Sequence, residues 1–128
     1  MSAFVVFTTV GTEEQANLIA RELVCRRHAA CVNIVPGIRS VYRWNGKVCR
    51  DTEFLLVIKT KDTEYAEVEA AIRELHSYEL PEILGFDVAK GEANFLAWID
   101  GALDKSQMTP CPEDEDEEPV LPLDETGY

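Results

Sequence analysis

The sequence lacks several features that mark common functional classes. No apolar run approaches the 18 residues of a membrane span, and residues 1–14 combine neither a positive segment nor a long apolar one. The chain has only two histidines, and no Gly-rich phosphate loop, Ser/His/Asp set or paired-carboxylate motif stands out. We therefore expect a protein of the cytoplasm that has no membrane segment and is not an enzyme.

Positive charge is also scarce. Twelve Lys and Arg oppose 24 Asp and Glu, which gives a net charge of −12. Residues 106–128 hold eight of the acids and no Lys or Arg, so residues 1–105 carry a net charge of only −4. A nucleic-acid-binding domain needs a clustered basic face. We therefore expect no nucleic-acid partner.

The composition changes near residue 105. Residues 1–105 have the length of one domain with a single core. Residues 106–128 contain four prolines and the acid run Glu113–Glu118, a composition that buries too little apolar surface to offset the entropy of ordering. We expect this tail to be disordered. A docking motif at residues 120–123 or a weak cation sink are the alternatives.

Cysteine usage indicates no metal or disulfide framework. Cys25, Cys31, Cys49 and Cys111 form no CxxC pair and no spacing typical of zinc sites. Free thiols in a reducing compartment are therefore expected. Cys25 falls on the polar face of the first expected helix, which predicts an exposed position or a subunit contact.

The segment Cys31–Lys61 organises the chain. Two runs rich in Val, Ile, Tyr, Phe and Trp flank Asn45-Gly46, the strongest short-range signal for a two-residue hairpin turn. Each 14-residue arm would reach about 46 Å, whereas a body of about 105 residues has a diameter of roughly 33 Å. The part of the hairpin that extends beyond the body would expose unpaired backbone groups, so we expect a homo-oligomer in which another strand pairs with it. Pro36-Gly37 predicts a bend in the first arm.

The remaining segments complete an α+β pattern. Residues 3–10 read as a buried strand, and Thr12 with Gln15 as a capping box that opens a helix ending near His28. Asp62–Glu64 predicts the cap of a second helix, residues 83–89 a fourth strand, and residues 92–103 a C-terminal helix. The order β-α-β-β-α-β is that of the ferredoxin-like split βαβ fold.

Two groups of residues are candidates for a binding site. His76 ends the second helix and is interpreted as a hydrogen-bonded structural histidine, a metal ligand or another kind of ligand residue. The loop that follows, with Tyr78 and Glu82, is the densest polar grouping of residues 1–105. Loops on a rigid scaffold often carry binding residues, although solvated acids would explain this loop equally well.

The second group lies at the hairpin tip. Tyr42, Arg43, Trp44 and Lys47 mix aromatic and cationic side chains. Such residues favour interface packing, and ligand binding is the alternative.

Two segments resemble a known family. Ser40–Lys47 (SVYRWNGK) and His76–Ile83 (HSYELPEI) are similar to the signature segments of the CutA divalent-cation tolerance proteins, as are residues 4–24 and 95–99. The likeness extends over residues 3–104. It implies a ferredoxin-like protomer in a tight homotrimer, related in assembly to the PII signalling proteins, with hairpin arms pairing between subunits.

The resemblance also implies a cytoplasmic role in tolerance of copper or other divalent metals. A copper-binding member of the family uses a Cys on its first strand and adjacent histidines after its second helix. This chain has Thr8 and Leu75-His76 at those places, so only His76 carries over. Thiolate and imidazole ligands favour copper, and we therefore expect any binding of copper or zinc to be weak.

Besides the possibility that a stable trimer only tethers another component and binds no specific metal or anion, two functional hypotheses remain. In the first, clefts between subunits of a homotrimer use His76, with Tyr78 and Glu82 nearby, to bind a divalent cation. In the second, a PII-like signalling or scaffold trimer binds a small anionic metabolite or a partner protein, with Arg43, Lys47, Lys59 and Lys61 supplying positive charge.

Overall fold

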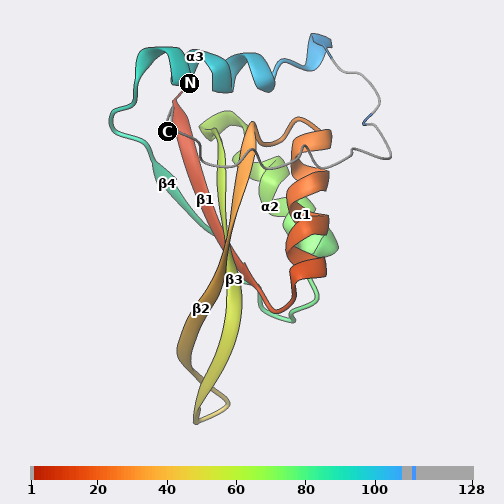
Figure 1. Ribbon diagram of the computed structural model, residues 1–128, viewed down its shortest axis with the longest axis vertical. Helices are drawn as coiled ribbons and strands as arrows, with labels where there is room; N and C mark the ends of the chain where they lie inside the picture. Colours follow the sequence, from red (N-terminus) through yellow and green to blue (C-terminus); the bar gives the residue numbers. More distant parts are fainter. Residues whose placement is uncertain (1, 108–110, 112–128) are drawn as a thin grey trace, which may run out of the picture.

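The computed structural model describes residues 2–107 and residue 111. Four strands form one antiparallel sheet in the order β2-β3-β1-β4 (Figure 1). The elements are β1 (Ala3–Val10), α1 (Glu13–Cys25), β2 (Cys31–Trp44), β3 (Lys47–Lys61), a 3-10 turn (Asp62–Glu64), α2 (Tyr65–Leu75), β4 (Leu84–Asp87), α3 (Ala93–Ala102) and a 3-10 turn (Lys105–Gln107). The predicted split βαβ fold is confirmed. None of the helices in residues 2–107 is long and apolar enough to cross a membrane.

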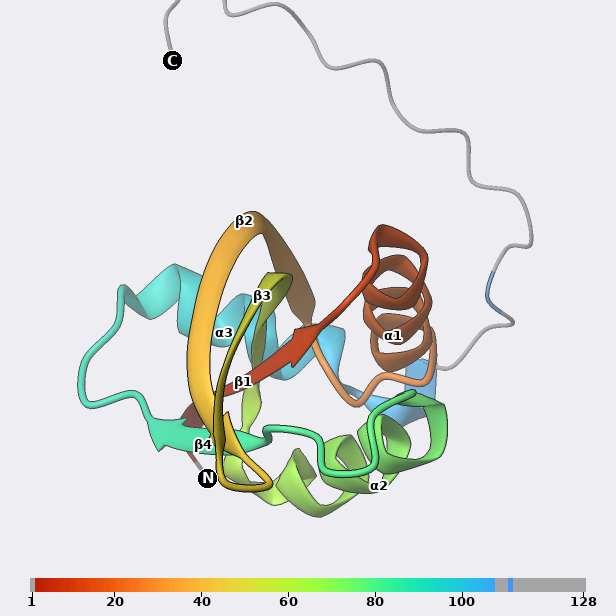
Figure 2. The same ribbon diagram turned by 90° about the horizontal axis from the view of Figure 1, so that it is seen from below.

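Helices α1 and α2 lie together on one face of the sheet (Figure 2). Alternate residues of β1 and β3 point toward these helices. Their side chains pack against the apolar sides of α1 and α2. The core comprises Val6, Val10, Ala16, Ile19, Leu23, Ala29, Leu56, Ile58, Val68, Ala71 and Ile72. A separate small cluster of Ala30, Ile99 and Leu103 holds α3 across the end of the body opposite the hairpin (Figure 1).

Within residues 2–107, no helix covers the other face of the sheet over the central strands, and this face is apolar. Opposed residues of an antiparallel pair point to the same side, and the register places Phe7 opposite Val57 and Leu84. Phe7 and Phe86 pack with ring centroids 5.0 Å apart. Leu84 and Phe86 remain half exposed. We call this surface the open sheet face.

The hairpin has the predicted length, tip and bend. Asn45 and Gly46 both have positive φ, at 51° and 77°, as a two-residue turn of this kind requires. The register between β2 and β3 shifts between Val35 and Ile38, where Pro36-Gly37 forms the bulge. Because β1 pairs only with Phe54–Lys61 of β3, the distal part of the hairpin has no third strand within the described chain.

Two capping predictions are wrong in part. Thr12 does accept a hydrogen bond from the Gln15 amide at 3.1 Å, but the Gln15 side chain turns to the end of α2 instead of completing the capping box. Glu64, within the predicted segment, is the N-cap residue of α2, but its side chain makes no capping hydrogen bond, and the Asp62 carboxylate instead accepts from the Ser2 amide at the start of β1. Helix α1 ends at Cys25, three residues before the predicted end.

The expectation of four free thiols is also wrong. Cys25, half buried at the end of α1, forms a disulfide with Cys111, and their Cα atoms are 5.3 Å apart. Cys31 and Cys49 carry free thiols. Lys105 is held at the body, because it donates to the Arg27 carbonyl and lies 3.1 Å from Glu64. The predicted disorder concerns a tail that lies largely outside the described residues.

Candidate functional site

The candidate site lies where the hairpin leaves the body, and its centre is Glu53. This carboxylate is only 6% exposed and stands opposite Ile38, the first paired residue after the bulge. The Tyr78 hydroxyl donates a 2.7 Å hydrogen bond to Glu53 Oε2. A buried carboxylate needs such a donor, because an unpartnered one would bear the full cost of leaving water.

Gly11 allows the Tyr78 side chain to reach Glu53. Any Cβ at residue 11 would lie 2.9 Å from the Tyr78 hydroxyl, closer than side chains normally approach. Gly11 follows β1 directly, so the phenol crosses the end of that strand to meet β3. The predicted site residue Tyr78 is thus linked to a strand that lies 25 positions away in sequence.

His76 holds Tyr78 in place. Its Nε2 lies 2.7 Å from the Thr9 carbonyl, and its Nδ1 lies 3.0 Å from the Tyr78 backbone amide. A carbonyl only accepts and an amide N–H only donates, so this geometry requires the neutral tautomer with the proton on Nε2. The two rings also pack with centroids 4.7 Å apart. Both ring nitrogens are therefore occupied within the chain.

Gln15 fixes the same loop from α1. Its side-chain amide donates to the Leu75 carbonyl at 2.8 Å and accepts from the Ser77 amide at 3.0 Å. These two bonds satisfy backbone groups at the end of α2 that would otherwise lack partners. The loop that carries Tyr78 is therefore held by both α1 and β1.

A second pair of a phenol and a carboxylate lies farther out on the hairpin. Tyr42 of β2 donates to Asp51 of β3, two residues before Glu53 on the same side of the strand. This hydrogen bond raises the pKa of the exposed Tyr42 phenol to about 12. Burial, together with the hydrogen bond to Glu53, raises the pKa of Tyr78. At neutral pH both phenols are therefore protonated donors to carboxylates.

The described residues of one chain bring few metal-ligating side chains together. Residues 2–107 and 111 contain no group of three or more His, Cys, Asp and Glu side chains that would hold a metal ion. His76 would have to give up a hydrogen bond to become a ligand. Thr8, which replaces the strand-one cysteine, is fully buried against the helices. Glu82 is exposed and makes no hydrogen bond or ion pair with the described residues.

The proposed cationic groups do not converge. Trp44 and Lys47 are paired at the tip next to Arg43, whereas Lys59 and Lys61 lie at the other end of β3. Lys59 donates to Asn33, and Lys61 lies 3.5 Å from Asp100.

Lys61 instead borders a cavity of about 320 Å³ between the start of β1, the segment 88–91 and α3. Lys90 is the second cationic side chain that lines it.

Sequence reasoning missed Glu53, Asp51, Gly11 and Gln15. Glu53 and Asp51 precede the apolar run of β3 and were not distinguished from other strand-edge acids. The sequence indicates only that Gly11 ends the first strand. It does not indicate that the Tyr78 side chain packs over this glycine.

Known proteins resemble this chain in both sequence and fold. The family model described as CutA1 divalent ion tolerance protein matches residues 4–102. A relative from Thermus thermophilus, the divalent-cation tolerance protein CutA, is 45% identical over 95 residues, covering 74% of this chain and 92% of its own. The chloroplastic protein CutA of Arabidopsis thaliana is 39% identical over 97 residues, covering 76% of this chain and 53% of its own.

Solved structures agree with this assignment. The Thermus thermophilus protein superposes with a TM-score of 0.74 at 44% identity, covering 76% of this chain and 94% of its own. The structure of the periplasmic divalent cation tolerance protein CutA from Archaeoglobus fulgidus gives 0.78 at 36% identity, covering 80% and 99%. The chain therefore belongs to the CutA1 family of divalent ion tolerance proteins.

Proposed function

We propose that this protein acts in divalent metal ion tolerance as a homotrimer that binds metal ions in clefts between its subunits. The observation that carries the proposal is an apolar surface that nothing in the described chain covers. The open sheet face exposes about half of Leu84 and Phe86, and Trp44, on the same side of the hairpin, is 41% exposed. Contiguous apolar surface of this kind marks an interface.

The sheet edges support assembly through the hairpin. The outer part of β3, Lys47–Glu53, pairs with β2 on one side and has no strand on the other within the described chain. Unpaired strand edges present backbone donors and acceptors to any strand that approaches. A neighbouring copy that pairs here would lie directly beside Glu53 and Tyr78.

Such a contact would bring a second set of ligands to Glu53 and Asp51. Glu53 and Asp51 each keep a carboxylate oxygen that Tyr78 and Tyr42 do not engage. Carboxylate oxygens suit hard divalent ions, whereas copper prefers thiolate and imidazole. In this arrangement His76 positions Tyr78, and the remaining ligands come from the second copy. Binding of copper or zinc would be weak.

Native mass spectrometry of the full chain, with and without copper, zinc and manganese, tests assembly and metal binding together. We expect a species of three 14.4 kDa chains that takes up metal in multiples of three. A monomer or dimer at micromolar concentration would contradict the trimer. A trimer that takes up none of the three ions would contradict metal binding and leave the assembly intact.

Calorimetry of matched variants locates the ligands. We expect Glu53→Gln to weaken metal binding more than His76→Gln, because Glu53 would contact the ion and His76 would act through Tyr78. Glu69→Gln, a change of the same kind on the exposed side of α2, serves as the control. Equal isotherms for Glu53→Gln and the control would remove Glu53 from the site.

The cavity beside α3 favours a second candidate function. It is bordered by Lys61, Lys90 and Asp100 and has a volume of about 320 Å³. The excess of one positive charge would suit a small anionic metabolite. In that case the trimer would act as a PII-like signalling or scaffold protein. A thermal-shift screen of phosphorylated and carboxylated metabolites tests this, because a ligand of the native state raises its apparent stability. Lys90→Ala should abolish any shift found.

Two further expectations remain part of the proposal. The protein would act by binding and not by catalysis, and it would act in the cytoplasm. The names of two relatives place those proteins in the chloroplast and in the periplasm. Cell fractionation with an antibody against the full chain tests the location directly.

A further inference from the structure

One side of the distal hairpin concentrates arginine. In the register of β2 and β3, Arg39 stands opposite Thr52, Val41 opposite Arg50, and Arg43 opposite Val48. Opposed residues share a side, and alternate residues of a strand point the same way. These six residues therefore form one surface, and all six are exposed. We call it the arginine face.

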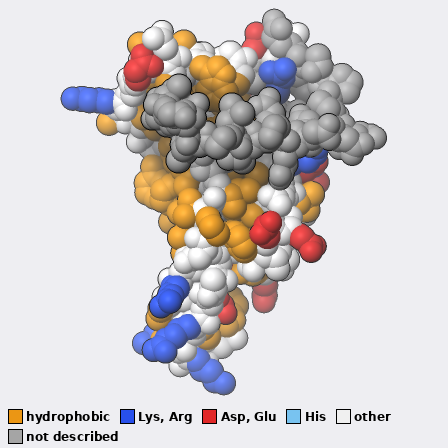
Figure 3. All heavy atoms as spheres, viewed as in Figure 1, with side chains coloured by type: hydrophobic (Ala, Val, Ile, Leu, Met, Phe, Trp, Pro, Cys, Tyr) orange, Lys and Arg blue, Asp and Glu red, His pale blue; other side chains and the backbone are white. Residues whose placement is uncertain are grey.

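The three arginines lie close together. Arg50 is diagonal to both Arg39 and Arg43, at a spacing of about 7–8 Å between neighbouring side chains. No ion pair of any of the three is found within residues 2–107 and 111. The nearest hairpin acids, Asp51 and Glu53, point to the opposite side and are held by phenols. Figure 3 shows Lys and Arg side chains gathered on the hairpin at the lower end of the molecule.

We propose that the arginine face docks the acid run Glu113–Glu118 of a second copy of this chain. The run supplies six consecutive carboxylates, and no Lys or Arg follows residue 105. Along an extended segment, every second side chain recurs at about 6.6–6.8 Å, which matches the spacing of the arginines. Arginine and carboxylate pair through two parallel hydrogen bonds. A nucleic acid fits poorly, because the chain as a whole carries a charge of −12.

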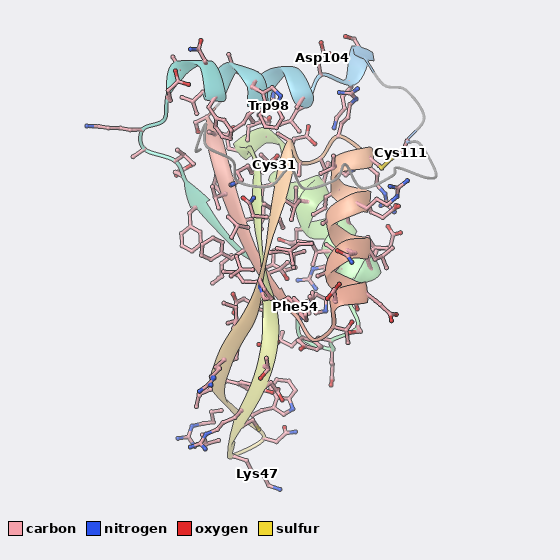
Figure 4. All side chains as sticks on the ribbon, viewed as in Figure 1. Cys31, Lys47, Phe54, Trp98, Asp104 and Cys111 are labelled. Atoms are coloured by element: carbon pink, nitrogen blue, oxygen red, sulfur yellow. A yellow bond between two sulfur atoms is a disulfide. The ribbon has the colours of Figure 1, made fainter. Side chains whose placement is uncertain are left out.

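Chain length favours a second copy over the same chain. In Figure 4, Cys111 and Cys31 both lie in the upper part of the molecule, and Lys47 lies at the opposite end. The strand from Cys31 to Arg43 covers 12 residues, or about 40 Å. The disulfide holds Cys111 at α1, and Glu118, seven residues on, lies at most about 25 Å from it. The acid run Glu113–Glu118 is therefore too short to reach Arg43 of the same chain.

The arginine face and the open sheet face lie on opposite sides of β3. Asp51 and Glu53 lie on the same side of β3 as Leu55 and Val57 of the open sheet face, and the arginine face is on the other side. Assembly through the open sheet face would therefore not cover the arginines.

Fluorescence anisotropy tests the pairing. The probe is a fluorescein-labelled peptide of residues 112–128, and the receptor is the full chain with the six acids of the run changed to amides, which leaves its arginine face unoccupied. We expect binding that weakens when NaCl is raised from 50 to 500 mM. Arg50→Ser in this receptor should weaken binding at least tenfold. Arg73→Ser, which removes an exposed arginine on α2, should leave it unchanged.

Two results would overturn the proposal. One is no binding at 50 mM NaCl, and the other is equal loss in the Arg50→Ser and Arg73→Ser receptors. Tripolyphosphate is included as a competitor. If it binds the face and the peptide does not, the surface recognises phosphate groups and not the acid run.

A complementation experiment tests docking between copies. A ¹⁵N-labelled chain with the amide-substituted run is mixed with an unlabelled Arg39→Ser/Arg50→Ser chain that keeps its acids. Only the labelled copy then has an intact arginine face, and only the other has an intact run. We expect the amide signals of residues 39–52 to shift in the labelled copy. Unchanged signals would overturn docking in trans.

Discussion

The buried bond between Tyr78 and Glu53 makes a sharp prediction about stability. Tyr78→Phe removes one hydroxyl and leaves Glu53, 6% exposed, without its donor. A hydrogen bond to a charged group contributes about 1.5–3 kcal/mol. Tyr78 is 37% exposed, so water replaces part of the loss. We therefore expect the free energy of unfolding to fall by about 1–2 kcal/mol.

Tyr42→Phe is the matched control, because it removes the same group from the same kind of partner. Tyr42 and Asp51 are both exposed, so water satisfies Asp51 once the phenol is gone. We expect a smaller loss than for Tyr78→Phe. Thermal unfolding at one fixed protein concentration measures both, and the Tyr78 variant should melt about 5–10 °C lower. Equal losses in the two variants would refute the reasoning from burial.

The same bonds predict a loss of stability at high pH. The pKa of Tyr42 is raised from 10 to about 12 by its bond to Asp51, and that of Tyr78 is raised by burial and by Glu53. A raised pKa in the folded state means that the stabilisation is fully present below pH 10. It is lost as the pH rises through the folded-state value. Burial and the hydrogen bond with Glu69 raise the pKa of Tyr65 as well. Absorbance at 295 nm, which follows phenolate formation, should therefore show three late-titrating tyrosines in the native protein.

Three substitutions elsewhere test packing and the disulfide. Gly85→Ala would place a Cβ 2.3 Å from the Phe4 ring and should cost about 1–3 kcal/mol in chemical unfolding. Gly101→Ala in α3 meets no atom within 4 Å and should stabilise by about 0.5–1 kcal/mol, so a loss there would contradict the packing account. Cys111→Ser opens a bridge of sequence separation 86 and should cost about 2–4 kcal/mol without reductant. Thiol titration of the unsubstituted chain should find only Cys31 and Cys49, and titration of Cys25 and Cys111 as well would contradict the bridge.

The hairpin was predictable because its signals are local. Asn45-Gly46 specifies positive φ at two consecutive residues, and both angles are positive in the structure. Pro36-Gly37 marks the bulge for the same kind of reason, since proline cannot donate to the strand ladder. The length of the overhang then follows from the rise per residue alone.

The candidate site was less predictable because it depends on contacts between distant segments. His76 and Tyr78 were identified as a polar grouping, but their partners Thr9 and Glu53 lie 67 and 25 positions away. Gln15 has a local role that its sequence position indicates, and the structure gives its side chain a different one. Tertiary hydrogen bonds give these side chains partners that the sequence does not indicate.

The arginine face shows the same limit in the strands. Before the bulge, odd-numbered residues of β2 such as Asn33 share a side with the odd-numbered residues of β3. After the bulge, Arg39 and Arg43 share a side with Arg50 instead. A bulge inserts an extra residue and reverses the alternation. Counting along β2 without the position of the bulge would therefore place the arginines on the wrong side.

Alternation on β3 also separates charges of opposite sign. Arg50, Asp51, Thr52 and Glu53 follow one another in sequence, yet the arginine points to one side and both acids to the other. The acids share their side with the open sheet face, where assembly would enclose them next to Tyr42 and Tyr78. The arginines remain outside. Substitutions on one side should therefore leave the other intact: Glu53→Gln would alter metal binding and not peptide docking, and Arg50→Ser would do the reverse.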